Sequence, residues 1–233
     1  MNVNDENNKM TAQAQAVDLD ECEGQQSVDV SFAAHSATAT TIEAEQLYRA
    51  SAYGLIAALL RVAPDQHMLD HLTGLSRGVA AEGDDLLLAM STLALSADLH
   101  TPASIDDEFH ELFIGLGKGE IVPYGSWYQT GFLMEKPLSD LRDDLATLGY
   151  VRNSSVVEPE DHVAALCEVI SMMISDGIDI SIQRKFFQSH MTDWMSRFFT
   201  DLGEARSAIF YKSVGRFGAA FIAFEKEYFS MQT

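Results

Sequence analysis

Apolar residues recur at helical spacing through almost the whole chain after residue 42. From Glu43 onward, nearly every segment carries apolar side chains three and four positions apart, which places them on one face of an α-helix. Residues 149–157 alone are compatible with a strand, and they fit a linker better. We therefore predict an all-α protein, folded as a single helical bundle with a candidate hinge near residues 150–158.

The expected helices can be delimited from their apolar stripes and their caps. A first helix begins near Glu43 and ends before Pro64, because proline disfavours helical backbone in the residue before it. Ser104 is a candidate N-cap for a later helix that runs to about Leu116. A loop over residues 115–126 follows. The remaining helices are expected over residues 65–72, 84–99, 137–148, 159–174, 186–199 and 209–228.

Residues 1–40 differ from the rest of the chain in composition. They are rich in Asn, Gln, Asp, Glu, Ser, Thr and Ala and show no sustained periodicity. Such a segment cannot bury enough apolar area to offset the entropy lost on ordering. We expect an acidic, disordered leader over residues 1–40, followed by an all-helical domain over residues 41–233. Deleting the leader should leave the melting temperature nearly unchanged.

The charge balance limits the classes of partner. The chain has 35 acidic and 15 basic residues, a net charge of −20. This argues against a nucleic-acid partner, because neutralising phosphates requires lysine and arginine. A basic peptide partner is compatible with it. Solubility alone would favour the same charge, so both explanations stay open.

The sequence gives no sign of export or membrane insertion. The apolar run at residues 55–60 is far shorter than the ~18 residues that span a bilayer. Lys9 is the only Lys or Arg before Arg49, and no apolar region follows it, so no secretory signal is recognisable. Cys22 and Cys167 match no metal-site spacing, and their contexts argue against a disulfide. We expect no membrane span and a cytoplasmic location.

Three short segments, in a particular order, are the most informative part of the sequence. The first reads EFHELFIG at residues 108–115 and is followed by PYGSWY at residues 123–128. The second reads EPEDH at residues 158–162, and the third reads FFQSHMTDW at residues 186–194. Together they resemble the TorD/DmsD family, chaperones that escort molybdenum-containing redox enzymes before export. The resemblance extends over roughly residues 45–230.

The resemblance implies a chaperone that binds the twin-arginine signal peptide and the apo form of a molybdoenzyme. It would hold the apoprotein until the molybdopterin cofactor is inserted and so delay export, with no cofactor of its own. A chaperone for a cytosolic nitrate reductase subunit is the alternative within the family. Monomers or domain-swapped dimers are expected. The residues that the resemblance assigns to peptide binding are Pro123, Tyr124, Trp127, Tyr128, Pro159, Asp161 and His162.

The EPEDH segment also has a purely structural interpretation. Pro159 suits the first position of a helix, which would place Asp161 in the first turn, where the helix dipole favours a carboxylate. Helix capping is therefore the alternative to a peptide site. If Asp161 instead faces an arginine of the peptide, replacing it with Asn should weaken binding and barely change stability. The dipole disfavours a charged His162 whereas neighbouring carboxylates favour one, so its protonation state stays open.

The aromatic residues admit two interpretations as well. Tyr124, Trp127 and Tyr128 could plug the bundle, as most aromatic rings do, or form the floor of an apolar groove for a peptide helix. His190 and Trp194 are four residues apart, so they would share one face of a helix. We expect these two to pack in the core.

Enzyme motifs are weak in this sequence. The glycine-rich residues 115–119 lack the spacing of a phosphate-binding loop, and no strand is expected before them. The repeated Glu-x-x-His pairs of helical di-iron sites are also missing. The alternative to a chaperone is a helical metal-dependent enzyme that uses His110, Glu111, Asp161 and His162. Metal analysis of the purified protein would separate the two.

Overall fold

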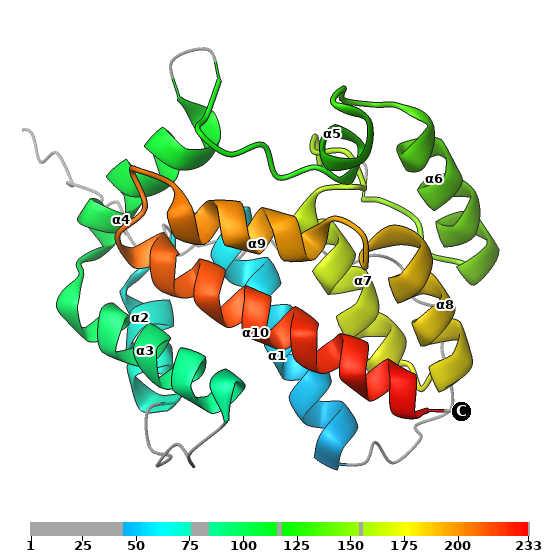
Figure 1. The fold of residues 1–233 in the computed structure, drawn as a ribbon, viewed down its shortest axis with the longest axis horizontal. Coiled ribbons are helices and arrows are strands. Elements are labelled where there is room, and N and C mark those ends of the chain that lie inside the picture. The colour runs from blue at the N-terminus through cyan, green and yellow to red at the C-terminus, as the bar shows by residue number, and fades with distance from the viewer. Residues whose placement is uncertain (1–43, 76–83, 116–117, 154–155, 233) are drawn as a thin grey trace, which may run out of the picture. The chain divides into compact units, whose positions relative to one another are not determined.

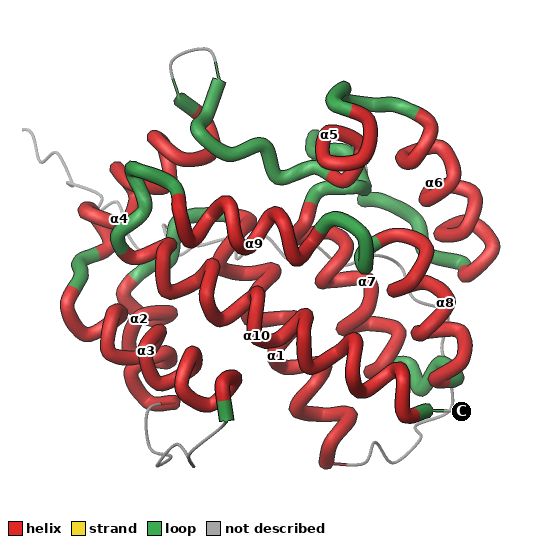
Figure 2. The backbone as a smooth tube through the Cα atoms, in the orientation of Figure 1, coloured by secondary structure: helices red, strands yellow, loops and turns green. Residues whose placement is uncertain are grey.

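The structure is a computed structural model that describes residues 44–75, 84–115, 118–153 and 156–232. These residues belong to one compact unit and form helices joined by loops, with no strand among them (Figure 1, Figure 2). The predicted all-α fold is confirmed. Within the described part, no helix is long and apolar enough to cross a membrane. The predictions for the leader and for Cys22 fall on residues that lie outside the described ranges.

The helices follow the chain in an order that Figure 1 shows by colour. A π-helical turn, His110–Ile114, directly continues α4. The α-helices are α1 Ala44–Arg61, α2 Gln66–Gly74, α3 Asp85–Leu99, α4 Pro102–Phe109, α5 Gly125–Thr130, α6 Lys136–Leu148, α7 Val163–Ser175, α8 Ile180–His190, α9 Met195–Glu204 and α10 Phe210–Met231.

Capping side chains fix several of these boundaries where the sequence predicts them. The carboxylate of Asp65 accepts a 2.8 Å hydrogen bond from the Met68 N–H at the start of α2. The carboxylate of Asp84 accepts one of 2.9 Å from the Leu87 N–H at the start of α3. Gly149 ends α6 with a φ of 81°, a left-handed conformation that favours glycine.

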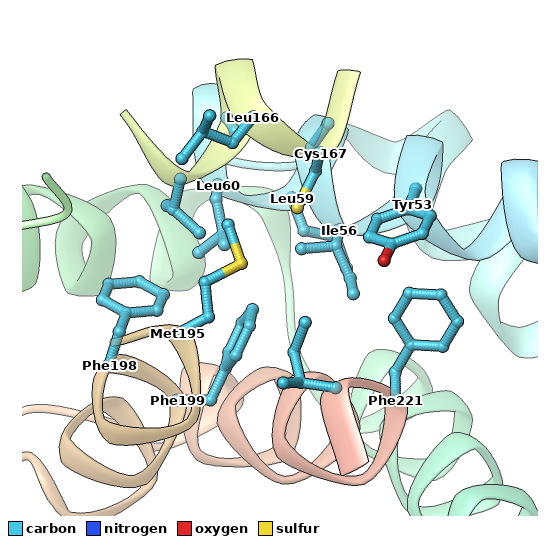
Figure 3. Close-up of a cluster of buried hydrophobic side chains, with 14 of the residues drawn as sticks. Tyr53, Ile56, Leu59, Leu60, Leu166, Cys167, Met195, Phe198, Phe199 and Phe221 are labelled. Carbon is cyan, nitrogen blue, oxygen red and sulfur yellow. The ribbon is translucent and has the colours of Figure 1, made fainter. Parts of the chain in front are cut away.

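The core lies where the first and last helices meet. Helix α1 packs on α7, and α10 packs on α9 and α3. Figure 3 shows side chains of α1 and α7 facing those of α9 and α10 across the interior. Almost no water reaches this layer, so burial of its apolar area is the main stabilising contribution. Its fully buried members include Tyr53, Ile56, Leu59, Leu166, Cys167, Met195, Phe198, Phe199 and Phe221.

Helices α9 and α10 approach each other unusually closely. A Cβ atom added at Gly218 would overlap the ring of Phe199, and one added at Gly215 would lie 2.6 Å from the backbone nitrogen of Gly203. Only a hydrogen on the Cα atom fits at either position. Gly215 lets the backbones of the two helices meet directly, and Gly218 makes room for the Phe199 ring.

A buried ion pair joins the N-terminal and C-terminal helices. The guanidinium of Arg49 on α1 donates two 2.7 Å hydrogen bonds to the carboxylate of Glu225 on α10. It donates a third, of 3.1 Å, to Gln183 on α8. The hydroxyl of Tyr53 donates to the same carboxylate at 2.8 Å. Because all four side chains are buried, these bonds satisfy polar groups that water cannot reach.

The glutamate of the EFHELFIG segment has a structural role at the start of α10. The buried Glu108 carboxylate accepts hydrogen bonds from the backbone N–H groups of Ile209, Phe210 and Tyr211, at 2.7–3.0 Å. These N–H groups have no partner inside their own helix, and the positive end of the helix dipole favours a negative charge there. Glu108 therefore fixes α10 to α4.

One predicted helix begins and ends differently from the expectation. Ser104 is not the N-cap of α4. Thr101 is, and Ser104 sits three residues later and closes a capping box. The helix expected to reach about Leu116 ends as an α-helix at Phe109 and continues as the π turn. Gly115 then closes this turn, because its N–H donates to the carbonyl of His110 and its φ is 57°.

The single helix predicted over residues 186–199 is wrong, because the chain breaks into α8 and α9. The buried indole N–H of Trp194 donates a 2.7 Å hydrogen bond to the carbonyl of His190, the last residue of α8. The N–H groups of Met191 and Thr192 both donate to the carbonyl of Phe187. The intervening turn brings Trp194 into the core, as expected for it and for His190.

One residue of the candidate hinge, Tyr150, is fixed to the core. Tyr150 is buried, and its hydroxyl donates a 2.9 Å hydrogen bond to Asp176 at the end of α7. Residues 154–155 lie outside the described part of the chain. The hinge and the exchange of helices between copies therefore stay predictions.

Candidate functional site

The three signature segments meet at Gly125. Its N–H donates a 2.9 Å hydrogen bond to the carbonyl of Asp161 in the EPEDH segment. A Cβ atom at this position would lie 3.2 Å from the indole of Trp194 in the third segment. Glycine thus lets the first segment lie against the other two. The three residues that meet, Gly125, Asp161 and Trp194, are 36 and 33 positions apart in sequence, yet they form one structural unit here.

Two short stretches of backbone pair next to this point. Tyr124 and His162 form an isolated antiparallel bridge. The N–H of Val163 donates a 2.9 Å hydrogen bond to the carbonyl of Pro123, which is buried. The PYGSWY segment and the EPEDH segment therefore lie side by side, as their joint assignment to one site requires.

Asp161 does not occupy the position that the sequence suggests. Helix α7 begins at Val163, so Pro159 and Asp161 precede it and form part of a turn in which the His162 N–H donates to the Pro159 carbonyl. Asp161 is only 3% exposed. Its Oδ2 atom accepts a 2.7 Å hydrogen bond from the N–H of Ser126 at the start of α5. The expectation that Asp161 sits in the first turn of α7 is wrong.

His162 is the N-cap of α7, and its ring is held in the neutral form. Its Nδ1 atom accepts a 3.1 Å hydrogen bond from the Ala164 N–H, so the ring proton of the neutral form is on Nε2. Burial, and to a lesser extent the positive charge of Arg61, lowers the pKa of His162 from 6.5 to about 3. A neutral ring does not repel a basic ligand.

Tyr124 covers His162 and faces a carboxylate. The two rings lie 5.1 Å apart in an edge-to-face arrangement. The Tyr124 hydroxyl donates a short hydrogen bond to Glu158, which is exposed. Burial and this carboxylate raise the pKa of Tyr124 well above its usual value. The half-buried ring and the exposed carboxylate together form an acidic, aromatic surface, which we call the Tyr124–Glu158 surface.

Trp127 and Tyr128 face a different part of the molecule. The Nζ atom of Lys118 lies 4.2 Å from the centroid of the Trp127 ring. The Tyr128 hydroxyl donates a 2.9 Å hydrogen bond to Asp201 on α9. Both rings, with Asp201, Glu120 and Arg197 among others, line a cavity of about 430 Å³. The seven predicted residues therefore divide into a Tyr124 group and a Trp127–Tyr128 group.

The residues of the metal-dependent alternative do not form a metal site. In the described residues, no group of three or more His, Cys, Asp or Glu side chains could hold a metal ion. The Nδ1 atom of exposed His110 lies 2.9 Å from the carbonyl of Asp106, one turn earlier in the same helix. Asp161 and His162 both bind backbone N–H groups instead.

Sequence reasoning missed the residue that organises this region. Ser126 is fully buried, donates its N–H to Asp161 and accepts a 3.2 Å hydrogen bond at Oγ from the Met134 N–H. Its carbonyl accepts a 2.8 Å bond from the Thr130 hydroxyl. Helix α5 itself was also not predicted, because six residues are too few to show a helical period.

Comparison with known proteins places the chain in a family. A family model described as nitrate reductase delta subunit matches residues 73–200, which is more than half of the 233-residue chain. The chain belongs to this family. The expected membership of the TorD/DmsD group of redox-enzyme chaperones is confirmed by this match together with the relatives that follow.

Relatives with the name chaperone protein TorD are identical to the chain at about a quarter of the aligned residues. The one from Vibrio atlanticus is 27% identical over 203 residues, which covers 77% of this chain and 94% of the relative. The one from Vibrio parahaemolyticus is 26% identical over 157 residues, which covers 62% of this chain and 72% of the relative. These relatives are named as chaperones, so the chain belongs with chaperones and not with enzymes.

A solved structure shares the fold. A candidate redox enzyme maturation protein from Archaeoglobus fulgidus superposes with a TM-score of 0.51 and 18% sequence identity. The match covers 76% of this chain and 93% of that one. At this identity, the comparison establishes the helical fold.

Proposed function

We propose that this chain is a cytoplasmic chaperone that binds the twin-arginine signal peptide and the apo form of a molybdoenzyme. It holds the apoprotein until the molybdopterin cofactor is inserted and delays export until then. Kinship with TorD chaperones supports the class of protein. The site geometry supports the class of ligand, which is a peptide with a basic N-terminal region followed by an apolar core.

The observation that carries the proposal is the pairing of the Tyr124 ring with the Glu158 carboxylate beside His162. An arginine side chain can stack on an aromatic ring and donate to a carboxylate at the same time. The neutral His162 ring adds no opposing charge. The net charge of −20 attracts a basic peptide from a distance.

Glu158, and not Asp161, is the carboxylate we assign to an arginine of the peptide. Asp161 is buried and bonded to Ser126, so an incoming arginine would have to break that bond. Glu160 is also engaged, because it pairs with Arg142 at 2.8 Å and with Arg152 at 3.3 Å. Glu158 is exposed and bonded to a hydroxyl that can rotate to another partner.

Calorimetric titration with a synthetic peptide tests the proposal. The peptide carries two adjacent arginines followed by about a dozen Leu and Ala residues, the length of a signal-peptide core. Glu158→Gln should weaken binding by about twofold to fivefold and reduce its salt dependence, as expected for an exposed ion pair. Asp107→Asn, at an exposed carboxylate of α4, is the matched control and should change neither.

Two results would contradict the proposal. The first is that the unmodified chain fails to bind this peptide. The second is that it binds equally well a peptide in which both arginines are replaced by glutamine, because the arginines would then contribute nothing.

A further inference from the structure

The loop between α5 and α6 exposes three consecutive large apolar side chains. Phe132 is 69% exposed, Leu133 48% and Met134 73%. Single exposed apolar residues are common, but contiguous ones mark a surface that binds another apolar group. We call residues 132–134 the apolar loop.

The apolar loop is held in place and strained. Met134 has a φ of 59°, a left-handed conformation that side chains other than glycine seldom adopt. Its N–H donates to Ser126 Oγ at 3.2 Å, and the Phe132 N–H donates to the Thr130 hydroxyl at 3.2 Å. These bonds fix the backbone of the loop, and its three side chains remain exposed. Such strain concentrates at binding sites, where it prepares a surface for a ligand.

The loop is coupled to the EPEDH segment through Ser126. This buried residue accepts from Met134 at its hydroxyl and donates its N–H to the Asp161 carboxylate. Asp161 is therefore a positioning residue for the apolar loop, on which it acts through Ser126.

A cavity borders the same loop. It has a volume of about 580 Å³ and is lined by Thr130, Lys136, Pro137, Asp140, Asp144 and His190, among others. Thr130 ends α5 and Lys136 begins α6, each two positions from the apolar loop in sequence. Residues 135–144 contain four carboxylates against two cations. Asp140 pairs with Lys136 at 2.5 Å and Asp144 with His190 at 2.8 Å. The other two carboxylates, Glu135 and Asp143, are exposed.

We propose that the apolar loop binds the apolar core of the signal peptide, and that the exposed carboxylates of Glu135 and Asp143 beside it add to the attraction for a basic chain. This rests on the proposed function and adds a second contact surface to it. The charge balance favours this occupant over a second copy of the chain, because two copies with a net charge of −20 repel each other.

Titration with two peptides tests the assignment in the full chain. The first is the peptide with the arginine pair and the Leu and Ala core, and in the second the leucines are replaced by serines. Combining Phe132→Ser with Leu133→Ser should weaken binding of the first peptide by about tenfold to a hundredfold, because two apolar contacts are lost. The second peptide should bind the variant and the unmodified chain alike. Leu95→Ser with Leu99→Ser, at exposed leucines of α3, is the matched control and should leave both affinities unchanged.

The outcomes separate the two proposals. If the unmodified chain binds the first peptide and the loop variant binds it equally well, the loop assignment is wrong and the proposed function stands. If the unmodified chain binds neither peptide, the proposed function fails and the loop assignment fails with it.

Discussion

The Oδ2 atom of Asp161 accepts a 2.7 Å hydrogen bond from the backbone N–H of Ser126, and both residues are buried. This contact gives the EPEDH segment a structural role. The carboxylate caps the short helix α5 from a distance of 35 residues in sequence, and through Ser126 it fixes the apolar loop. A substitution at Asp161 should therefore act on folding and on binding together.

Replacing Asp161 with Ala should destabilise the fold by about 1–3 kcal/mol, because the buried N–H of Ser126 loses its acceptor. Asp161→Asn should cost less, since its amide oxygen can still accept that bond. Urea denaturation of the three proteins measures the difference. An Ala variant as stable as the unmodified chain would show that the hydrogen bond contributes nothing.

The positioning role of Asp161 has a readout that a general loss of stability would not move. Under conditions in which every variant is folded, Asp161→Ala should reduce the preference for the peptide with the Leu and Ala core over its serine counterpart. Asp161→Asn should restore most of that preference. If Ala weakens both peptides equally, Asp161 acts on the whole site and not through the apolar loop.

His162 should make stability depend on pH. Its pKa is lowered from 6.5 to about 3 in the folded chain, so between these values the unfolded state binds a proton that the folded state does not. Stability from this group is present at neutral pH and is lost as the pH falls below 6.5, by roughly 2–3 kcal/mol on reaching about pH 4.5. Asn can also cap α7 but does not titrate. His162→Asn should therefore flatten this part of the stability profile, as followed by urea denaturation across the pH range. Parallel profiles for the two proteins would contradict the assignment.

Glu108 should be needed for the fold although it belongs to a signature segment. Glu108→Ala leaves three N–H groups at the start of α10 without an acceptor and should cost about 1–3 kcal/mol. Glu111→Ala, at an exposed position of the following π turn, is the control and should change the free energy of unfolding little. Equal effects of the two substitutions would mean that the cap is not formed.

The sequence predicted what depends on neighbours along the chain. Apolar stripes located most of the helices, and caps such as Asp84 and Gly149 located their ends. The break between α8 and α9 was missed because it depends on the core, where the buried indole of Trp194 packs against the Tyr128 ring of α5. No local pattern distinguishes a helix from two helices joined in this way.

The candidate site was predicted in part for the same reason. The family resemblance correctly placed the PYGSWY and EPEDH segments together, which spacing alone would not do. The roles of single residues depend on partners far apart in sequence, 35 positions for Asp161 and 101 to 103 for Glu108. The exposure of residues 132–134 was not visible either, because a short apolar run reads as buried until its surroundings are known.

The crossing of α9 and α10 gives a prediction that tests steric overlap apart from any change in backbone conformation. Gly218 lies within α10, so alanine suits its backbone, but the added Cβ atom would overlap the Phe199 ring. Gly218→Ala should therefore destabilise the chain by about 1–3 kcal/mol through overpacking alone. Gly74→Ala at the end of α2 meets no atom within 4 Å and should be neutral or slightly stabilising, because alanine favours helix. Thermal melts of the two variants give the comparison. Similar melting temperatures would show that the two helices can separate at no cost, and the close contact at Gly218 would then not be a determinant of the fold.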